Sequence, residues 1–282
     1  MQILNLRLHS RVLFQCVDLV ITLPDSVTRS ADKRRVLYLL HGAGCDQRTW
    51  LQSREFTHAM EHRELIAVLP SAQNSDYTDW PDFGRGYDFP RFFFEELMPF
   101  VTSVFPASDK AADTYLAGQS MGGYGAALLG LMHPERFAGL GIYSASLRES
   151  AFLQPYRGRP SADFRADALA RPQAFPTEYG PPQLGIKRKE INVIAKYAAV
   201  DDFLRSKDCM WNRLGEVSPS ILPHLYVSCG EQDLFYPATQ RLQARCRALG
   251  IASAHFEYQP NTGHDEQFMN AQLEKSLVWF GI

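Results

Sequence analysis

Ser120 lies at the centre of the sequence Gly-Gln-Ser-Met-Gly over residues 118–122. The run before it, residues 114–118, is rich in strand-forming side chains, and residues 121–133 have the character of a helix. A serine between a strand and a helix sits on a tight turn with its hydroxyl exposed, and the motif glycines keep other β-carbons away from it. The helix amino terminus also places N–H groups near developing negative charge. The motif therefore predicts Ser120 as a nucleophile in acyl transfer.

A serine hydroxyl needs a base, because it is barely ionised at neutral pH. On a sheet of this kind the expected chain order is serine, acid, histidine. Asp233 follows a predicted strand at 224–229, and His264 follows another at 254–259. Both residues then lie at the same sheet edge as Ser120, which predicts a triad of Ser120, Asp233 and His264.

Bland alternatives exist for the two partners. Aspartates after glycine turns often cap helices, and Glu231 or Asp265 could supply the acid in place of Asp233. His255 lies inside a predicted strand, so we expect a structural role for it. His264 lies in a loop after Gly263, which allows a close approach to the serine.

A tetrahedral intermediate needs two N–H donors for its oxyanion. The residue after the nucleophile, Met121, should supply one. The turn His-Gly-Ala-Gly at residues 41–44 follows a predicted strand at 36–40 and should supply the other. We expect Ala43 to be that donor, with Gly44 as the second choice, and Gly42 to lie against the substrate. An ordinary glycine turn is the alternative.

Two aromatic residues are candidates for binding the substrate. Trp80 and Tyr87 lie in a loop rich in proline and glycine after a predicted strand at 66–70, where they could line the acyl site. A surface role is about equally plausible, since exposed aromatic side chains need no function. The aromatic run at residues 92–94 is expected to pack in the core.

One metal motif is present in the sequence. His58, Glu61 and His62 have the H-x-x-E-H spacing of inverted zinc proteases, and on a helix the two histidines share a face. The predicted helix directly follows the glycine turn, and the sequence offers no third ligand in a fitting context. We therefore predict no metal site.

The elements that must position these residues alternate along the chain. Short apolar strands at 36–40, 66–70, 114–118 and 137–143 are separated by predicted helices, including 55–64 and 92–105, and further helices follow near 238–249 and 266–279. This alternation predicts an α/β protein with a mostly parallel central sheet and helices on both faces. The proline- and arginine-rich segment 147–218 interrupts it. We interpret residues 1–282 as a single domain in which 147–218 is a cap-like excursion over the carboxyl edge of the sheet.

The composition limits the classes of partner that we expect this protein to bind. The net charge is -2, with 45% hydrophobic and 21% charged residues, which argues against binding nucleic acid or an anionic membrane. No apolar run reaches the roughly 18–20 residues of a membrane span. The five cysteines lack paired spacing and no signal peptide is evident, so we expect reduced thiols and a cytoplasmic location. The sequence leaves open whether the protein forms a homo-oligomer.

Taken together, these segments resemble the esterase D family, particularly its tributyrin-esterase and short-chain carboxylesterase members. The resemblance is carried by the elbow from Gly118 to Gly125, and by Leu39–Gly42, Tyr87–Leu97, Cys229–Asp233 and Gly263-His264. It implies an α/β-hydrolase fold, the triad and oxyanion donors named above, and hydrolysis of short acyl esters without metal or cofactor. Cys45 matches a cysteine of the related S-formylglutathione hydrolases, but Gln119 and Tyr124 stand where those enzymes usually carry histidines.

The leading functional hypothesis is therefore a serine carboxylesterase that forms an acyl-enzyme on Ser120 with a small-molecule ester. Within the same chemistry, an S-formylglutathione hydrolase or an acetyl or feruloyl sugar esterase remains open. A hydrolase-fold protein that binds a ligand without catalysis is a further alternative, because fold does not prove function.

Overall fold

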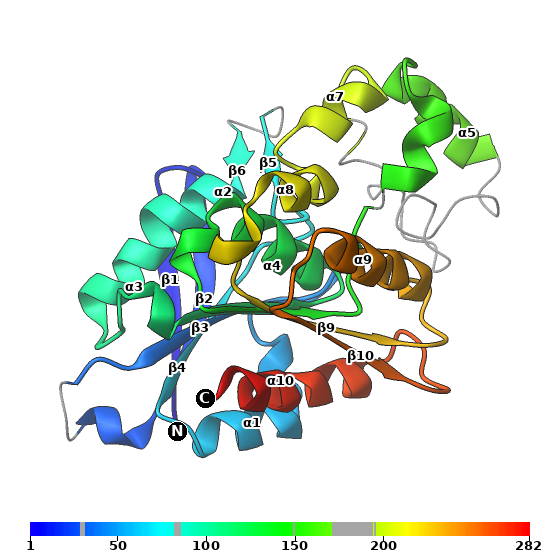
Figure 1. Ribbon diagram of the computed structural model, residues 1–282. Coiled ribbons are helices and arrows are strands. Elements are labelled where there is room, and N and C mark those ends of the chain that lie inside the picture. Colours follow the sequence, from blue (N-terminus) through cyan, green and yellow to red (C-terminus); the bar gives the residue numbers. More distant parts are fainter. Residues whose placement is uncertain (29–31, 82–85, 149, 171–193, 195) are drawn as a thin grey trace.

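The computed structural model describes residues 1–28, 32–81, 86–148, 150–170, 194 and 196–282 (Figure 1). Within this part of the chain, eight strands form one sheet in the order β1-β2-β4-β3-β7-β8-β9-β10. The strands are β1 (Gln2–Ser10), β2 (Gln15–Leu23), β3 (Arg35–Leu40), β4 (Leu65–Pro70), β7 (Thr114–Gln119), β8 (Gly139–Tyr143), β9 (His224–Gly230) and β10 (Ala254–Gln259). A separate two-stranded ribbon pairs β5 (Asp79–Trp80) with β6 (Tyr87–Asp88).

Parallel pairing runs from β4 through β3, β7, β8 and β9 to β10, whereas β1 and β2 are antiparallel to their neighbours. The inner strands are buried on both faces, which explains their continuous apolar sequences. Because parallel strands end at the same edge, the loops after β3, β7, β9 and β10 meet there. The predicted mostly parallel sheet is confirmed.

Helices cover both faces of this sheet, as predicted (Figure 1). On one face, α1 (Arg54–Glu61) and α10 (Glu266–Phe280) pack with Trp50 against the sheet. On the other face lie α2 (Phe89–Phe92), α3 (Met98–Val104), α4 (Met121–Met132) and α9 (Tyr236–Ala248). The helix after the serine can approach closely because its first turns carry glycine and alanine.

The helix predicted over 92–105 is confirmed as part of an unbroken helical run over 89–104, which changes its type along its length. The chain forms α2, a π-helical turn at Phe93–Leu97 and then α3. Pro99 has no N–H to donate to residue 95, and a wide turn just before it accommodates the missing hydrogen bond. The apolar side chains still face the core, because Phe93, Leu97 and Val101 are fully buried.

The described parts of segment 147–218 contain helices joined by turns. They are a 3-10 helix at Ser150–Tyr156, α5 (Ser161–Ala170), α7 (Val200–Arg205) and α8 (Met210–Glu216), and α8 packs against α4. Residues 149, 171–193 and 195 of the predicted excursion lie outside the described residues. Across the described chain, no helix combines the length and apolar character needed to cross a membrane.

Candidate active site

Ser120 occupies the turn between β7 and α4 with φ +55° and ψ -116°. This is a costly conformation for a residue with a β-carbon, and it persists only where its surroundings enforce it. The Ser120 N–H donates to the Tyr143 carbonyl at 2.8 Å, which ties the turn to β8. The turn also requires its glycines, since a β-carbon on Gly122 would lie 2.4 Å from the Leu40 oxygen.

His264 joins Ser120 to Asp233. Its Nε2 lies 3.1 Å from Ser120 Oγ, and its Nδ1 lies 2.9 Å from Asp233 Oδ2. A carboxylate only accepts, so Nδ1 carries the ring proton and Nε2 is available to accept the serine proton. The structure thus brings together three predicted residues from three loops at one sheet edge.

The Asp233 carboxylate, which accepts from His264, is held in place by its surroundings. The Asp233 side chain is fully buried, and its Oδ1 accepts from the Phe235 N–H at 2.9 Å. The Phe235 ring meets the imidazole edge to face, with centroids 5.2 Å apart. The two competing acids lie elsewhere: Glu231 is exposed, and Asp265 caps α10 by accepting from the Phe268 N–H.

The loops that carry Asp233 and His264 are in backbone contact. The Gln232 N–H donates to the Thr262 carbonyl at 2.8 Å. A β-carbon on Gly230 would lie 2.2 Å from that same oxygen, so only glycine allows the two loops to pack this closely. This contact fixes the spacing between acid and base.

The turn after β3 lies against the nucleophile. A β-carbon on Gly42 would contact the Ser120 β-carbon at 3.5 Å. The Gly44 N–H donates to Asn74 Oδ1 at 2.7 Å and is therefore occupied. Among the described residues, neither the Ala43 N–H nor the Met121 N–H has an acceptor. The geometry thus favours Ala43 over Gly44 as the second oxyanion donor.

The two aromatic residues predicted to bind substrate differ in their surroundings. Tyr87 is only 3% exposed and its hydroxyl donates to the Ala72 carbonyl at 3.3 Å, which favours a packing role. Trp80 is half-buried, and its Nε1 donates to the Ser75 carbonyl at 2.7 Å. The Lys196 ammonium lies 4.9 Å from its ring centroid. Their contact with substrate remains a prediction.

Two buried ion pairs lie near α4, and the sequence pattern did not reveal them. Arg148 Nη2 lies 2.8 Å from Asp76 Oδ1, and the guanidinium stands 5.7 Å from the centre of the Tyr124 ring. Lys196 Nζ lies 2.5 Å from Asp208 Oδ2. The Tyr124 hydroxyl, one helical turn after Ser120, donates to the Asp208 carbonyl at 2.6 Å.

The contacts around these pairs join parts of the chain that are distant in sequence, so spacing alone gave no signal for them. Lys196 Nζ also donates to the Asp79 carbonyl at 2.5 Å, and this bond fastens Lys196 to the β5–β6 ribbon. The Tyr124 hydroxyl fastens Asp208 to α4. These contacts hold the described residues around Lys196 and Asp208 against the ribbon and α4.

Cys45 lies beside the same turn and is half-buried. Burial raises the pKa of its thiol, and a hydrogen bond with the Thr49 side chain lowers this pKa by a smaller amount. The thiol is therefore held in its protonated form at neutral pH. It makes no contact with the triad that the structure records.

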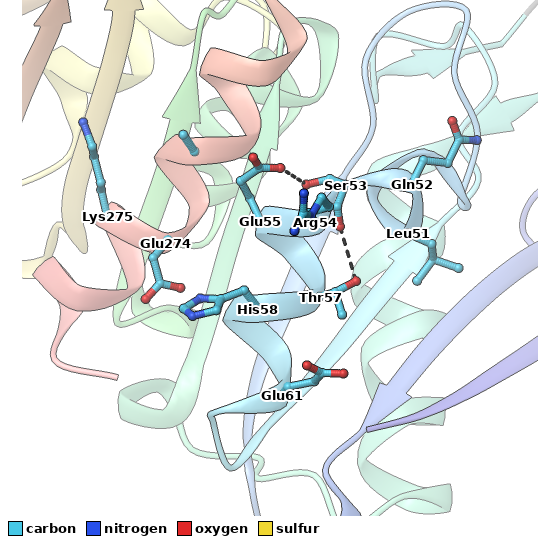
Figure 2. Close-up of a pocket in the computed structure, with 11 residues that line it drawn as sticks. Leu51, Gln52, Ser53, Arg54, Glu55, Thr57, His58, Glu61, Glu274 and Lys275 are labelled. Carbon is cyan, nitrogen blue, oxygen red and sulfur yellow. Dashed lines mark hydrogen bonds between the residues drawn. The ribbon is translucent and has the colours of Figure 1, made fainter.

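A cavity of about 750 Å³ lies away from the triad, between α1 and α10 (Figure 2). Side chains of both charges line it, among them Arg54, Glu55, His58 and Lys275. The His58 and His62 rings lie edge to face, with their centroids 4.9 Å apart. Within the described residues, no cluster of three or more histidine, cysteine or acidic side chains is arranged to hold a metal ion.

Comparison with known proteins identifies the family to which this chain belongs. The family model "Esterase: Putative esterase" matches residues 10–272. The chain belongs to this esterase family. An acetyl esterase of Caldicellulosiruptor saccharolyticus is 27% identical over 287 residues, covering 99% of this chain and 98% of that protein. The iron(III) enterobactin esterase of Escherichia coli K12 is 31% identical over 131 residues, which cover 46% of this chain and 31% of that protein.

Solved structures agree on the fold of this esterase. A fluorophosphonate-binding serine hydrolase of Staphylococcus aureus superposes with a TM-score of 0.78 at 20% identity, covering 99% of this chain and 98% of that one. An S-formylglutathione hydrolase of the same organism gives a TM-score of 0.73 at 19% identity, with coverage of 99% and 98%. The α/β-hydrolase fold predicted from the sequence is confirmed. The chain is a carboxylic ester hydrolase.

Proposed function

We propose that this esterase hydrolyses short-chain acyl esters through an acyl-enzyme on Ser120. The observation that carries the proposal is the pair of contacts made by His264, 3.1 Å to Ser120 Oγ and 2.9 Å to Asp233 Oδ2. A base within hydrogen-bond reach of the nucleophile, itself oriented by a buried acid, is the arrangement that activates serine.

In the first half-reaction, Ser120 Oγ attacks the ester carbonyl carbon while its proton passes to His264 Nε2. The buried Asp233 carboxylate stabilises the imidazolium that forms. His264 then gives this proton to the departing alcohol oxygen as the carbon–oxygen bond breaks. In the second half-reaction, His264 takes a proton from water as the water oxygen attacks the acyl carbon. His264 then returns this proton to Ser120 Oγ as the acyl–oxygen bond breaks, which releases the acid and restores Ser120.

Charge on the carbonyl oxygen develops between the turn after β3 and the start of α4. We propose that the Ala43 and Met121 N–H groups receive it, since Gly44 is already bonded to Asn74. The amino terminus of α4 adds its positive end to the same place. The loss of one such donor typically costs ~2.7–4 kcal/mol of transition-state stabilisation.

The acyl group is inferred from the relative that matches over full length. The Caldicellulosiruptor protein is named an acetyl esterase, and it covers almost all of this chain. We therefore place acetyl and other short acyl esters first. Described residues of segment 147–218 contact α4 through α8 and through the Tyr124–Asp208 hydrogen bond, and we propose that the segment selects the leaving group.

The test is a panel of p-nitrophenyl esters of increasing acyl length, with S-formylglutathione, acetylated sugars and methyl ferulate. We expect the highest kcat/KM on the shortest acyl esters. Ser120→Ala should lose roughly 10⁴–10⁶-fold in kcat, and a fluorophosphonate probe should label Ser120 in the wild type. Ser146→Ala, in the loop beside the elbow, serves as the matched control. Full activity in Ser120→Ala would refute the mechanism, and failure of the probe to label folded protein would favour a non-catalytic role.

A further inference from the structure

His41 directly follows β3 at the start of the oxyanion turn, and its side chain is 1% exposed. It accepts a hydrogen bond on Nε2 from the Ala72 N–H at 3.0 Å. A backbone N–H can only donate, so Nε2 is unprotonated and Nδ1 carries the proton. Nδ1 then donates to the Gly42 carbonyl oxygen at 2.8 Å. Burial lowers the pKa of this imidazole, so the ring is neutral at neutral pH.

The Gly42 carbonyl belongs to the same peptide unit as the Ala43 N–H. In a trans peptide these two groups point in opposite directions in one plane. The Gly42 oxygen also accepts from the Cys45 N–H at 3.3 Å, and the shorter bond from the buried His41 ring turns the Ala43 N–H away from the interior. Gly42 itself lies against Ser120, so this N–H belongs to a peptide beside the nucleophile.

We propose that His41 is a positioning residue that aims the Ala43 N–H at the oxyanion. The inference rests on the proposed Ser120 mechanism. The backbone around His41 is fixed by hydrogen bonds from two aromatic side chains, so the imidazole is rigidly held. The Tyr77 hydroxyl donates to the His41 carbonyl at 2.8 Å, and Trp50 Nε1 donates to the Leu40 carbonyl at 3.2 Å. His41 thereby couples the loop after β3 to the loop after β4.

Two substitutions separate the functions of the two ring nitrogens. In His41→Asn, the side-chain amide can replace the Nδ1 donor to Gly42 but leaves the Ala72 N–H without its acceptor. In His41→Gln, the longer side chain can replace the Nε2 acceptor, and the donor to Gly42 is lost. We expect His41→Gln to lower kcat by about 10–100-fold with KM within about threefold, because the donor acts in the transition state. His41→Asn should recover most of that loss.

A second readout follows the oxyanion directly. A trifluoromethyl ketone forms a hemiketal with Ser120 whose oxyanion occupies the same place as that of the intermediate. Its affinity should fall in parallel with kcat/KM in His41→Gln, while a ground-state product acid binds unchanged. Wild-type kcat and ketone affinity in His41→Gln, or equal losses in both variants, would overturn the proposal.

A measurement on the wild-type protein avoids the question of folding. The ¹⁵N shifts of the His41 ring should show a neutral imidazole protonated at Nδ1, and a ring protonated at Nε2 would overturn the assignment. The Ser120→Ala comparison keeps the two proposals distinct. If Ser120→Ala is inactive and His41→Gln is unaffected, only the role of His41 fails; if Ser120→Ala is active, the mechanism itself fails.

Discussion

The Gly44 N–H donates to the side-chain oxygen of Asn74 across 2.7 Å, whereas the Ala43 N–H has no acceptor among the described residues. We expect Ala43→Pro, which removes that N–H, to lower kcat by about 10²–10³-fold. Ala43→Gly keeps the N–H and should stay within several-fold of the wild type. Steady-state kinetics on p-nitrophenyl acetate checks both. Comparable kcat values for the two variants would show that the donor lies elsewhere.

Asp233→Asn tests the orientation of the base. An amide in this position can donate to the imidazole, which favours the wrong tautomer and leaves Nε2 protonated toward Ser120. We expect kcat to fall by about 10⁴-fold with little change in fold. The exposed neighbour Glu231→Gln is the matched control, and kinetics with circular dichroism checks both. A larger loss in Glu231→Gln would move the acid to that residue.

Gly122→Ala tests the packing of the elbow. The new β-carbon would lie 2.4 Å from the Leu40 oxygen and 2.7 Å from the His41 oxygen. Neither backbone atom can move without shifting the oxyanion turn, so we expect a loss of about 3 kcal/mol or more in unfolding free energy. Activity should be lost with it. Urea denaturation gives the first quantity and ester hydrolysis the second.

Gly215→Ala is the control for that substitution. Its new β-carbon would meet only Arg245 Nη2 at 2.8 Å, the end of a flexible and exposed side chain. Because alanine is favoured over glycine within a helix such as α8, this variant should gain about 0.5–1 kcal/mol in unfolding free energy. A loss equal to that of Gly122→Ala would contradict the packing argument.

The Lys196–Asp208 pair predicts a strong energetic coupling. The Asp208 side chain is fully buried and that of Lys196 is 9% exposed. Removing one charge leaves the other buried and unpaired, so we expect Asp208→Asn or Lys196→Met to cost about 3–5 kcal/mol in unfolding free energy. The double variant should cost clearly less than the sum, as a double-mutant cycle in urea would measure. Additive losses would show that the two charges act independently.

Stability should fall at alkaline pH because of buried thiols. Burial raises the pKa of Cys229 to about 12 and that of Cys246 to about 11, from an ordinary value of 9.0. Between pH 9 and 10 the unfolded chain therefore releases protons that the folded chain keeps, and each thiol costs up to about 1 kcal/mol per pH unit. This stabilising contribution is fully present below pH 9.

The variant Cys229→Ala/Cys246→Ala should show a flatter pH dependence in that window. Urea unfolding at pH 7, 9 and 10 measures it, and because the tyrosines, whose ordinary pKa is 10.0, are the same in both proteins, the difference in slope reports the two thiols. Between pH 7 and 8 the two proteins should differ by a constant offset only. The same slope above pH 9 in both proteins would contradict the prediction.

The sequence predicts most of the frame of the site, because local patterns encode it. A strand, a serine between glycines and a helix specify the elbow at Ser120, and chain order specifies where Asp233 and His264 must lie. The strand at 254–259 was predicted with the bounds that the structure gives it. These features depend on residues close in sequence and on the common edge of parallel strands.

What the sequence did not predict depends on contacts between distant segments. The occupation of the Gly44 N–H depends on Asn74, which lies 30 residues away. The tautomer of His41 depends on the Ala72 N–H, and the burial of Tyr87 depends on the packing of the β5–β6 ribbon. No spacing rule reports which of several loop residues will meet, so these were found only in three dimensions.

Ser120 and His264 are 144 positions apart, with segment 147–218 between them. In the proposed mechanism, one half of the chain therefore supplies the nucleophile and both amide donors, and the other half supplies the acid and the base. If the polypeptide were divided within this segment, each fragment alone would be inert, and turnover would return only when the two fragments reassociate along β8 and β9. Ester hydrolysis by this protein can thus serve as an optical signal for the reunion of two polypeptides.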